Sequence, residues 1–243
     1  MAKRNSKTFG IGVILALSFF AVLALIFAPV FGAGKDGKAM NGLDYADDLF
    51  NKLSKGSSYF IPKLQQGAQV HAGRAFEAEV TLDKPETAAL AATLFTAAGA
   101  KASADGAKLA VSGDLGAVLA AALRDADDMY KNDGAAVSAR YGGAKEKAAL
   151  KAWWGAFAAI DKSFKKGGKI EEAKAVSDVM KKALETAYNY YGVEAQKVAD
   201  KALLMTGLLV FYVAYTMWWG FAIFYIFDGV GLTMTKAKVK KEA

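Results

Sequence analysis

Two long apolar stretches, one near each end of the chain, dominate the pattern of hydrophobic and polar positions. The first runs from Thr8 to Gly34 and the second from Ala202 to Phe227, and neither contains a charged residue. Each is longer than the roughly 20 apolar residues that a helix needs to cross a bilayer. We therefore predict two transmembrane helices, at residues 9–33 and 202–228.

Between these spans the pattern is that of a mixed α+β protein. An entry segment, residues 34–74, holds an amphipathic helix that Asn41 can cap, followed by non-helical chain around Pro62 and a glycine-containing loop from Gly67 to Gly73. Apolar and polar residues then alternate with the period of a half-buried strand. The expected order is strand, helix, strand, strand, helix, strand, at residues 76–82, 85–98, 101–104, 107–112, 114–129 and 136–141.

This order is typical of a ferredoxin-like βαββαβ core, in which two helices cover one face of a four-stranded antiparallel sheet. We predict that fold for residues 75–142. Asp105-Gly106 is suited to a two-residue hairpin turn, and Asp114 is a suitable cap for the second helix.

From residue 143 to residue 201 the periodicity is helical. Gly167-Gly168 separates two helices, and the second shows no stop signal before Gly192. We therefore predict a helical hairpin whose last helix continues as a stalk into the second span, on the order of 87 Å if it is unbroken. The apolar stripe of the first of these helices comprises Leu150, Trp153, Trp154, Phe157, Ile160 and Phe164.

Basic residues flank the outer end of each span. The positive-inside rule then places residues 1–8 and the basic tail, residues 229–243, in the cytoplasm and the central domain outside. The chain has no cysteine and is rich in Ala, Lys and Gly, which favours a bacterial inner membrane with a periplasmic domain. The basic residues are Lys3, Arg4 and Lys7 before the first span, and Lys236, Lys238, Lys240 and Lys241 after the second.

An alternative interpretation treats the first span as a cleaved signal peptide, because Val30-Phe31-Gly32 before Ala33 is a tolerable cleavage site. The apolar run exceeds the usual length of about 7–15 residues for such a peptide, which favours retention. Cleavage would leave one C-terminal anchor with the same sidedness.

No motif in the sequence indicates catalysis. His71, the only histidine, could be a haem ligand or a general base, but it has no nearby partner and we interpret it as a loop residue. Asp125, Asp127 and Asp128 lack the spacing of a calcium loop and are expected to be a solvated acidic patch. The chain lacks nucleotide-binding and hydrolase motifs. We expect no enzymatic activity, no cofactor, no metal and no nucleic-acid partner.

Candidate assembly residues lie in the spans. Small side chains at Ala21, Ala24 and Ala28 allow close approach of another helix. Tyr215, Trp218 and Trp219 fall near the middle of the second span, where their polar atoms need partners, and Tyr225 lies nearer its end. The contact could be with the other span, with other subunits, with pigments or with lipids.

We therefore predict a non-catalytic structural or accessory subunit of a membrane protein assembly. Its partners would be membrane lipids and either further copies of the chain or the subunits of a larger membrane complex. The alternative is a ligand-sensing protein or an oligomeric channel with two spans per subunit.

Overall fold

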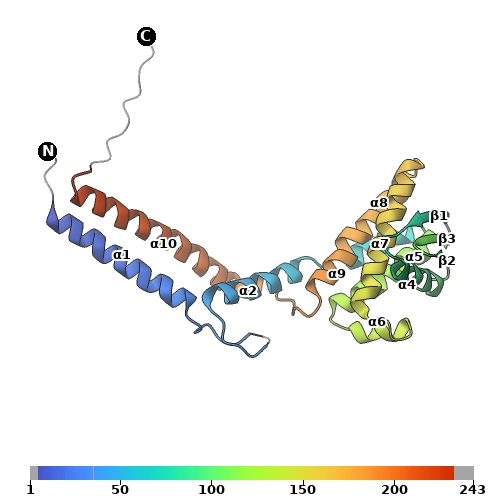
Figure 1. Ribbon diagram of the computed structural model, residues 1–243, viewed down its shortest axis with the longest axis horizontal. Coiled ribbons are helices and arrows are strands. Elements are labelled where there is room, and N and C mark those ends of the chain that lie inside the picture. The colour runs from blue at the N-terminus through green and yellow to red at the C-terminus, as the bar shows by residue number, and fades with distance from the viewer. Residues whose placement is uncertain (1–4, 35, 233–243) are drawn as a thin grey trace, which may run out of the picture. The chain divides into compact units, whose positions relative to one another are not determined.

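The computed structural model describes residues 5–34 and 36–232, which divide into two compact units (Figure 1). The first unit combines the chain up to Phe50 with the chain from Lys197 onward, and the second unit runs from Asn51 to Gln196. The predicted basic residues Lys3 and Arg4, and those of the C-terminal tail, lie outside the described residues.

The first unit is built on two antiparallel apolar helices, α1 (Ser6–Phe27) and α10 (Ala202–Gly229), which lie side by side. Both are long and apolar enough to cross a membrane. A 3₁₀ turn, η2 (Ala199–Lys201), precedes α10. The predicted amphipathic helix is confirmed as α2 (Gly42–Ser57), with the Asn41 side chain accepting hydrogen bonds from the backbone N–H groups of Leu43 and Asp44.

The second unit contains a small sheet surrounded by helices. Its elements in chain order are α3 (Ile61–Gln69), β1 (Ala75–Thr81), α4 (Pro85–Ala97), β2 (Lys101–Asp105), β3 (Lys108–Asp114), α5 (Leu115–Tyr130), α6 (Gly134–Arg140), α7 (Glu146–Lys166), α8 (Ile170–Val179), the π-helical segment η1 (Met180–Leu184) and α9 (Glu185–Tyr190).

The predicted strand alternation is confirmed in β1. Phe76, Ala78 and Val80 are buried, whereas Glu77 and Glu79 are exposed. The sheet has three antiparallel strands in the order β1-β3-β2. Burial alternates along β1 and along the first part of β3, so one face of the sheet packs on the core and the other faces solvent. Helices α4 and α7 both pack against the sheet.

The hairpin between β2 and β3 lies one residue further along the chain than predicted. Asp105 pairs with Lys108, so Gly106 and Ala107 are the two turn residues. Only Gly106 has a positive φ, of 56°. Glycine at the first central position suits a type II′ turn, which needs a positive φ at that residue alone.

The predicted last strand, residues 136–141, is wrong. These residues belong largely to α6, whose first turn is capped by Asp133 through a hydrogen bond from the backbone N–H of Ala136. Alanine favours helix once such a cap is available. The four-stranded ferredoxin-like sheet is therefore absent from the described residues, although its first five elements are present in the predicted order.

Two further predictions are corrected. Pro62 does not keep its neighbours out of a helix, because it lies in the first turn of α3, where a missing backbone N–H is harmless. The stalk is also interrupted: α9 ends at Tyr190, Gly192 has a φ of 83°, and regular helix resumes only at the start of α10.

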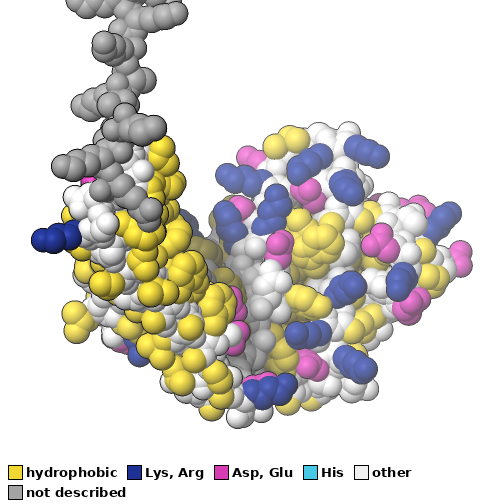
Figure 2. Space-filling model, turned by 60° about the vertical axis from the view of Figure 1, so that its left-hand side comes forward, with side chains coloured by type: hydrophobic (Ala, Val, Ile, Leu, Met, Phe, Trp, Pro, Cys, Tyr) yellow, Lys and Arg dark blue, Asp and Glu magenta, His cyan; other side chains and the backbone are white. Residues whose placement is uncertain are grey.

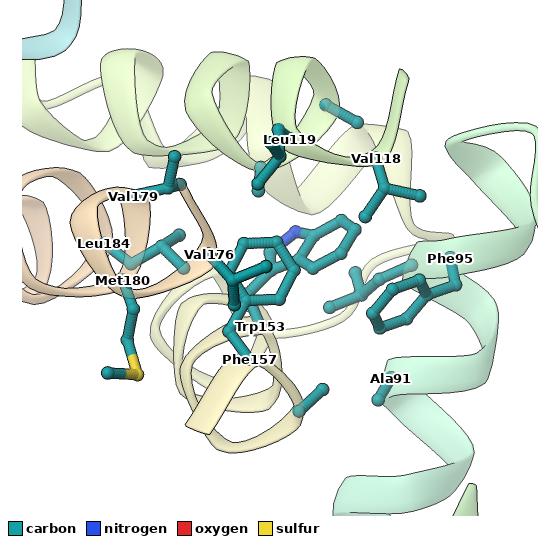
Figure 3. Packing of buried hydrophobic residues seen from close by; sticks show 14 of the residues in the cluster. Ala91, Phe95, Val118, Leu119, Trp153, Phe157, Val176, Val179, Met180 and Leu184 are labelled. Carbon is teal, nitrogen blue, oxygen red and sulfur yellow. The ribbon is translucent and has the colours of Figure 1, made fainter. Parts of the chain in front are cut away.

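Residues of the expected α+β domain and of the expected helical hairpin share one hydrophobic core (Figure 3). Phe95 of α4 contacts Trp153 of α7, with ring centroids 4.9 Å apart, and Val176 of α8 belongs to the same cluster. Trp154, predicted to lie on the apolar stripe of α7, is instead 42% exposed.

Candidate functional site

The close contact between α1 and α10 depends on two glycines. A Cβ atom at Gly12 would lie 2.6 Å from the backbone nitrogen of Ile226, and one at Gly229 would lie 2.5 Å from the Cα of Phe9. At the same end of the pair, the backbone N–H of Asn5 donates to the carbonyl oxygen of Gly229 over 3.0 Å. These positions have room only for glycine at the present helix separation.

The predicted mid-span aromatic residues lie against α1. The indole Nε1 of Trp218 donates a hydrogen bond of 3.1 Å to the carbonyl oxygen of Leu15. The ring of Tyr215 stacks on Phe19 with centroids 4.2 Å apart, and the ring of Trp219 contacts the same phenylalanine at 4.7 Å. The sequence left open whether these three residues meet the other span, another subunit, a pigment or a lipid. In the structure they pack between the two helices of the same chain.

The other predicted assembly residues are less enclosed. Tyr225 is half-buried, and its backbone lies beside Gly12. Ala21 and Ala24 are exposed, and Ala28 is half-buried. These small side chains therefore do not form the close contact with α10, which Gly12 and Gly229 form instead.

Few apolar side chains of the pair are fully buried. Only 6% of the positions in the most apolar window of each helix are buried. Figure 2 shows apolar side chains crowded over the surface of the paired helices, whereas acidic and basic side chains are spread over the second unit. An apolar surface of this extent needs a cover of lipid or protein.

A buried carboxylate in the second unit accepts hydrogen bonds from three other residues. Asp125 of α5 is fully buried, in contrast to the predicted solvated patch. Its side chain accepts hydrogen bonds from the indole Nε1 of Trp153, at 2.7 Å, from the hydroxyl of Tyr141 and from the guanidinium of Arg140. Arg140 also pairs with Asp128 at 2.7 Å.

The pKa values in this cluster reflect burial. Desolvation raises the pKa of Asp125, and the hydrogen bonds from Tyr141 and Trp153 and the charge of Arg140 act in the opposite direction. Burial and the bond to Asp125 raise the pKa of Tyr141. These buried hydrogen bonds join α5, the end of α6 and α7, so the cluster is suited to holding the three helices together.

Lys55 forms a second buried polar contact. Its Nζ donates to the side-chain oxygen of Asn132 at 3.0 Å and to the carbonyl oxygens of Tyr190 and Val193 at 3.2 and 2.6 Å. Tyr130 donates its hydroxyl hydrogen to the carbonyl oxygen of Lys55, and burial raises the pKa of this tyrosine to about 12. The contact lies within the second unit, where it joins the part of α2 from Asn51 onward to the ends of α5 and α9.

The remaining sequence candidates occupy separate places. His71 lies in the turn after α3, within the predicted loop, and is largely buried, at 8% exposed. Among the described residues, no group of three or more His, Asp or Glu side chains is placed to hold a metal ion.

Comparison of the chain with protein-family models, with curated proteins and with solved structures found no match.

Proposed function

We propose that the protein is a non-catalytic membrane subunit that acts by assembly, with the paired helices α1 and α10 as its anchor. The observation that carries this proposal is the apolar surface that the pair leaves open, since only 6% of the positions in the most apolar window of each helix are fully buried. A core helix of a soluble domain would bury that surface within its own chain. Lipids cover part of it in this proposal, and another subunit covers the rest.

The proposed location is a bacterial inner membrane, with both termini cytoplasmic and the second unit periplasmic. Antiparallel pairing supports a hairpin, because it brings Asn5 and Gly229 together at one end of the helix pair. The basic residues that flank the spans favour the cytoplasmic side for both termini. Protease added to intact spheroplasts should digest the second unit and spare a C-terminal tag. Loss of the tag with a protected second unit would refute this orientation.

The assembly surface is proposed to be the outward side of the pair. Trp218 and Trp219 contact α1 within the chain, so they support the shape of the hairpin and act on assembly only through it. Ala21 and Ala24, by contrast, are exposed and leave room for a neighbouring helix.

Paired variants separate these roles. In mild detergent, we expect Ala21→Leu with Ala24→Leu to lower the mass of the recovered complex while leaving the hairpin paired. Trp218→Leu with Trp219→Leu should leave insertion intact, loosen the hairpin and weaken the complex. A wild-type chain that is monomeric both in membranes and in mild detergent would disprove assembly.

The alternative of a ligand-sensing protein is favoured by one separate observation, a groove beside His71. The alternative of a two-span channel has less support, because the hydroxyls of Thr206 and Thr216 on α10 both donate to carbonyl oxygens of their own helix.

A further inference from the structure

A groove of about 640 Å³ lies between α3 and α8 in the second unit. This volume is within the range of about 300–1,000 Å³ usual for small-molecule sites. Its lining residues follow one face of each helix, at 60, 63, 64, 67 and 71 along α3 and its flanks, and at 171, 174, 175 and 178 along α8. Leu119 of α5 also lines the groove.

The groove has an apolar lining that no part of the second unit covers. Phe60 and Val70, which flank α3, are 47% and 76% exposed. Leu64 and Ala175 contribute further apolar surface. An apolar chain lying here would remove these side chains from water, which favours binding.

The charges around the groove favour an anion. Asp178 is paired with Lys182 at 2.7 Å, and Glu171 lies 3.6 Å from Arg74. Lys63 and Lys174 line the groove and have no ion-pair partner among the described residues. Arg74 is shared, because it lies closer to Glu172, at 3.1 Å, than to Glu171. The lining itself holds three lysines, Lys63, Lys174 and Lys182, against the two acidic residues Glu171 and Asp178, so its net charge is positive.

His71 supplies an independent indication of a ligand. It lines the groove, is 8% exposed, and its Nδ1 atom is buried without a hydrogen-bond partner among the described residues. A buried polar atom that stays unpaired is destabilising, so a ligand that pairs with it gains affinity. The His71 backbone packs closely on the start of α5: the N–H of Gly116 donates to the carbonyl oxygen of His71 at 3.1 Å, and a Cβ at Gly116 would lie 2.6 Å from the next residue, Ala72.

The far end of the groove meets an irregular helix. Val179 and Lys182 line it, and the π-helical segment η1 begins at Met180. Segments of this kind are rare within helices and frequently occur at functional sites.

We propose that this groove binds an amphipathic anion, with its apolar chain along α3 and α8 and its carboxylate or equivalent head group held by Lys63, Lys174 and His71. A medium-chain carboxylate such as dodecanoate is the simplest ligand of this class. The same chemistry is available from a free fatty acid and from an anionic lipid.

The test uses the full chain in phosphatidylcholine nanodiscs and a photoreactive dodecanoate probe, with labelled peptides mapped by mass spectrometry. We expect labelling within residues 60–71 and 171–182, and competition by dodecanoate but not by dodecyltrimethylammonium, which has the same chain and the opposite charge. Competition by added phosphatidylglycerol would identify a lipid as the source, and its absence would identify a free acid.

Charge variants complete the test. Lys63→Glu with Lys174→Glu changes only exposed side chains and should reduce labelling at least tenfold, a change of about 1.4 kcal/mol. Lys101→Glu with Lys108→Glu, on the exposed hairpin of the sheet, makes the same change in net charge and should have no effect. Labelling confined to α1 and α10, equal competition by the cationic amphiphile, or undiminished labelling of the first variant would each overturn the proposal.

Discussion

Replacing Gly12 by alanine should separate α1 from α10. The added Cβ would lie 2.6 Å from the backbone nitrogen of Ile226 and 2.9 Å from the carbonyl carbon of Tyr225. Ordinary contacts of a Cβ atom begin at about 3.4 Å, and backbone atoms cannot rotate away. The helices must therefore move apart locally by roughly 1 Å, which forfeits up to half of the dispersion energy of the affected atom pairs.

The expected cost is about 1–3 kcal/mol, the range for overpacking a close contact. The hydrogen bond from Trp218 to Leu15 adds to it if the separation extends that far, since such bonds between membrane helices average about 0.6 kcal/mol. Replacing glycine by alanine also raises helix propensity by about 1 kcal/mol, which has to be measured separately.

Gly10→Ala is the matched control. Gly10 lies on the same helix, two residues earlier, and a Cβ there would meet nothing within 4 Å. It makes the same change in propensity and composition without the collision.

The assay is quenching of tryptophan fluorescence by lipids brominated on their acyl chains. Trp218 and Trp219 are half-buried at the contact with α1, while Trp153 and Trp154 belong to the second unit. Gly12→Ala should increase quenching because lipid gains access to the two indoles, and Gly10→Ala should not. Equal quenching in the two variants and the wild type would show that the glycine contact does not set the helix separation.

Three further predictions concern the second unit, each checked by urea unfolding of the full chain followed by limited proteolysis. Asp125→Ala should lower the free energy of unfolding by about 3–5 kcal/mol, because it leaves the buried donors of Tyr141 and Trp153 without an acceptor and removes one of the two carboxylates that pair with Arg140. Asp125→Asn keeps an acceptor and should cost less; equal costs would contradict this. Val80→Asp should destabilise severely because it puts an unpaired charge on the buried face of the sheet, while Glu79→Gln on the exposed face should be nearly neutral. Hydrogen bonds from the backbone N–H groups of Gly73, Ala117 and Gly116 lower the pKa of Asp114. The ionised carboxylate therefore adds to the free energy of unfolding above its ordinary pKa of 3.8, and this stabilisation is lost as the pH falls through the lower pKa of the folded state. Asp114→Asn retains a cap but should weaken this acid dependence, and an unchanged pH profile would refute it.

Local signals in the sequence predicted the elements whose causes are local. Asn41 and Asp114 cap helices through their own neighbours, and the alternation of β1 follows directly from one buried face. The prediction of non-helical chain around Pro62 was wrong because proline is compatible with the first turn of a helix. The prediction of a strand after Asp133 was wrong because a capped, alanine-rich segment prefers helix to strand.

The interior contacts could not be predicted in the same way, since they join distant residues. Asp125 meets Trp153 across 28 positions and Lys55 meets Val193 across 138, and neither pairing has a local signature. The mid-span position of Trp218 and Trp219 did indicate a helix contact, but which helix they meet depended on the glycines of α1 and α10.

One unit is continuous in sequence and the other is not, and this difference sets an order of folding. The second unit is continuous in sequence, whereas α1 and α10 come from opposite ends of the chain. At about 5–20 residues per second, the ribosome needs roughly 10–40 s after making Gly12 to reach Ile226. The second unit can fold within that interval, whereas α1 has no α10 to pack against at Gly12 until the end of that time. Synthesis is therefore the period when α1 is most open to a chaperone or to pairing with the wrong helix.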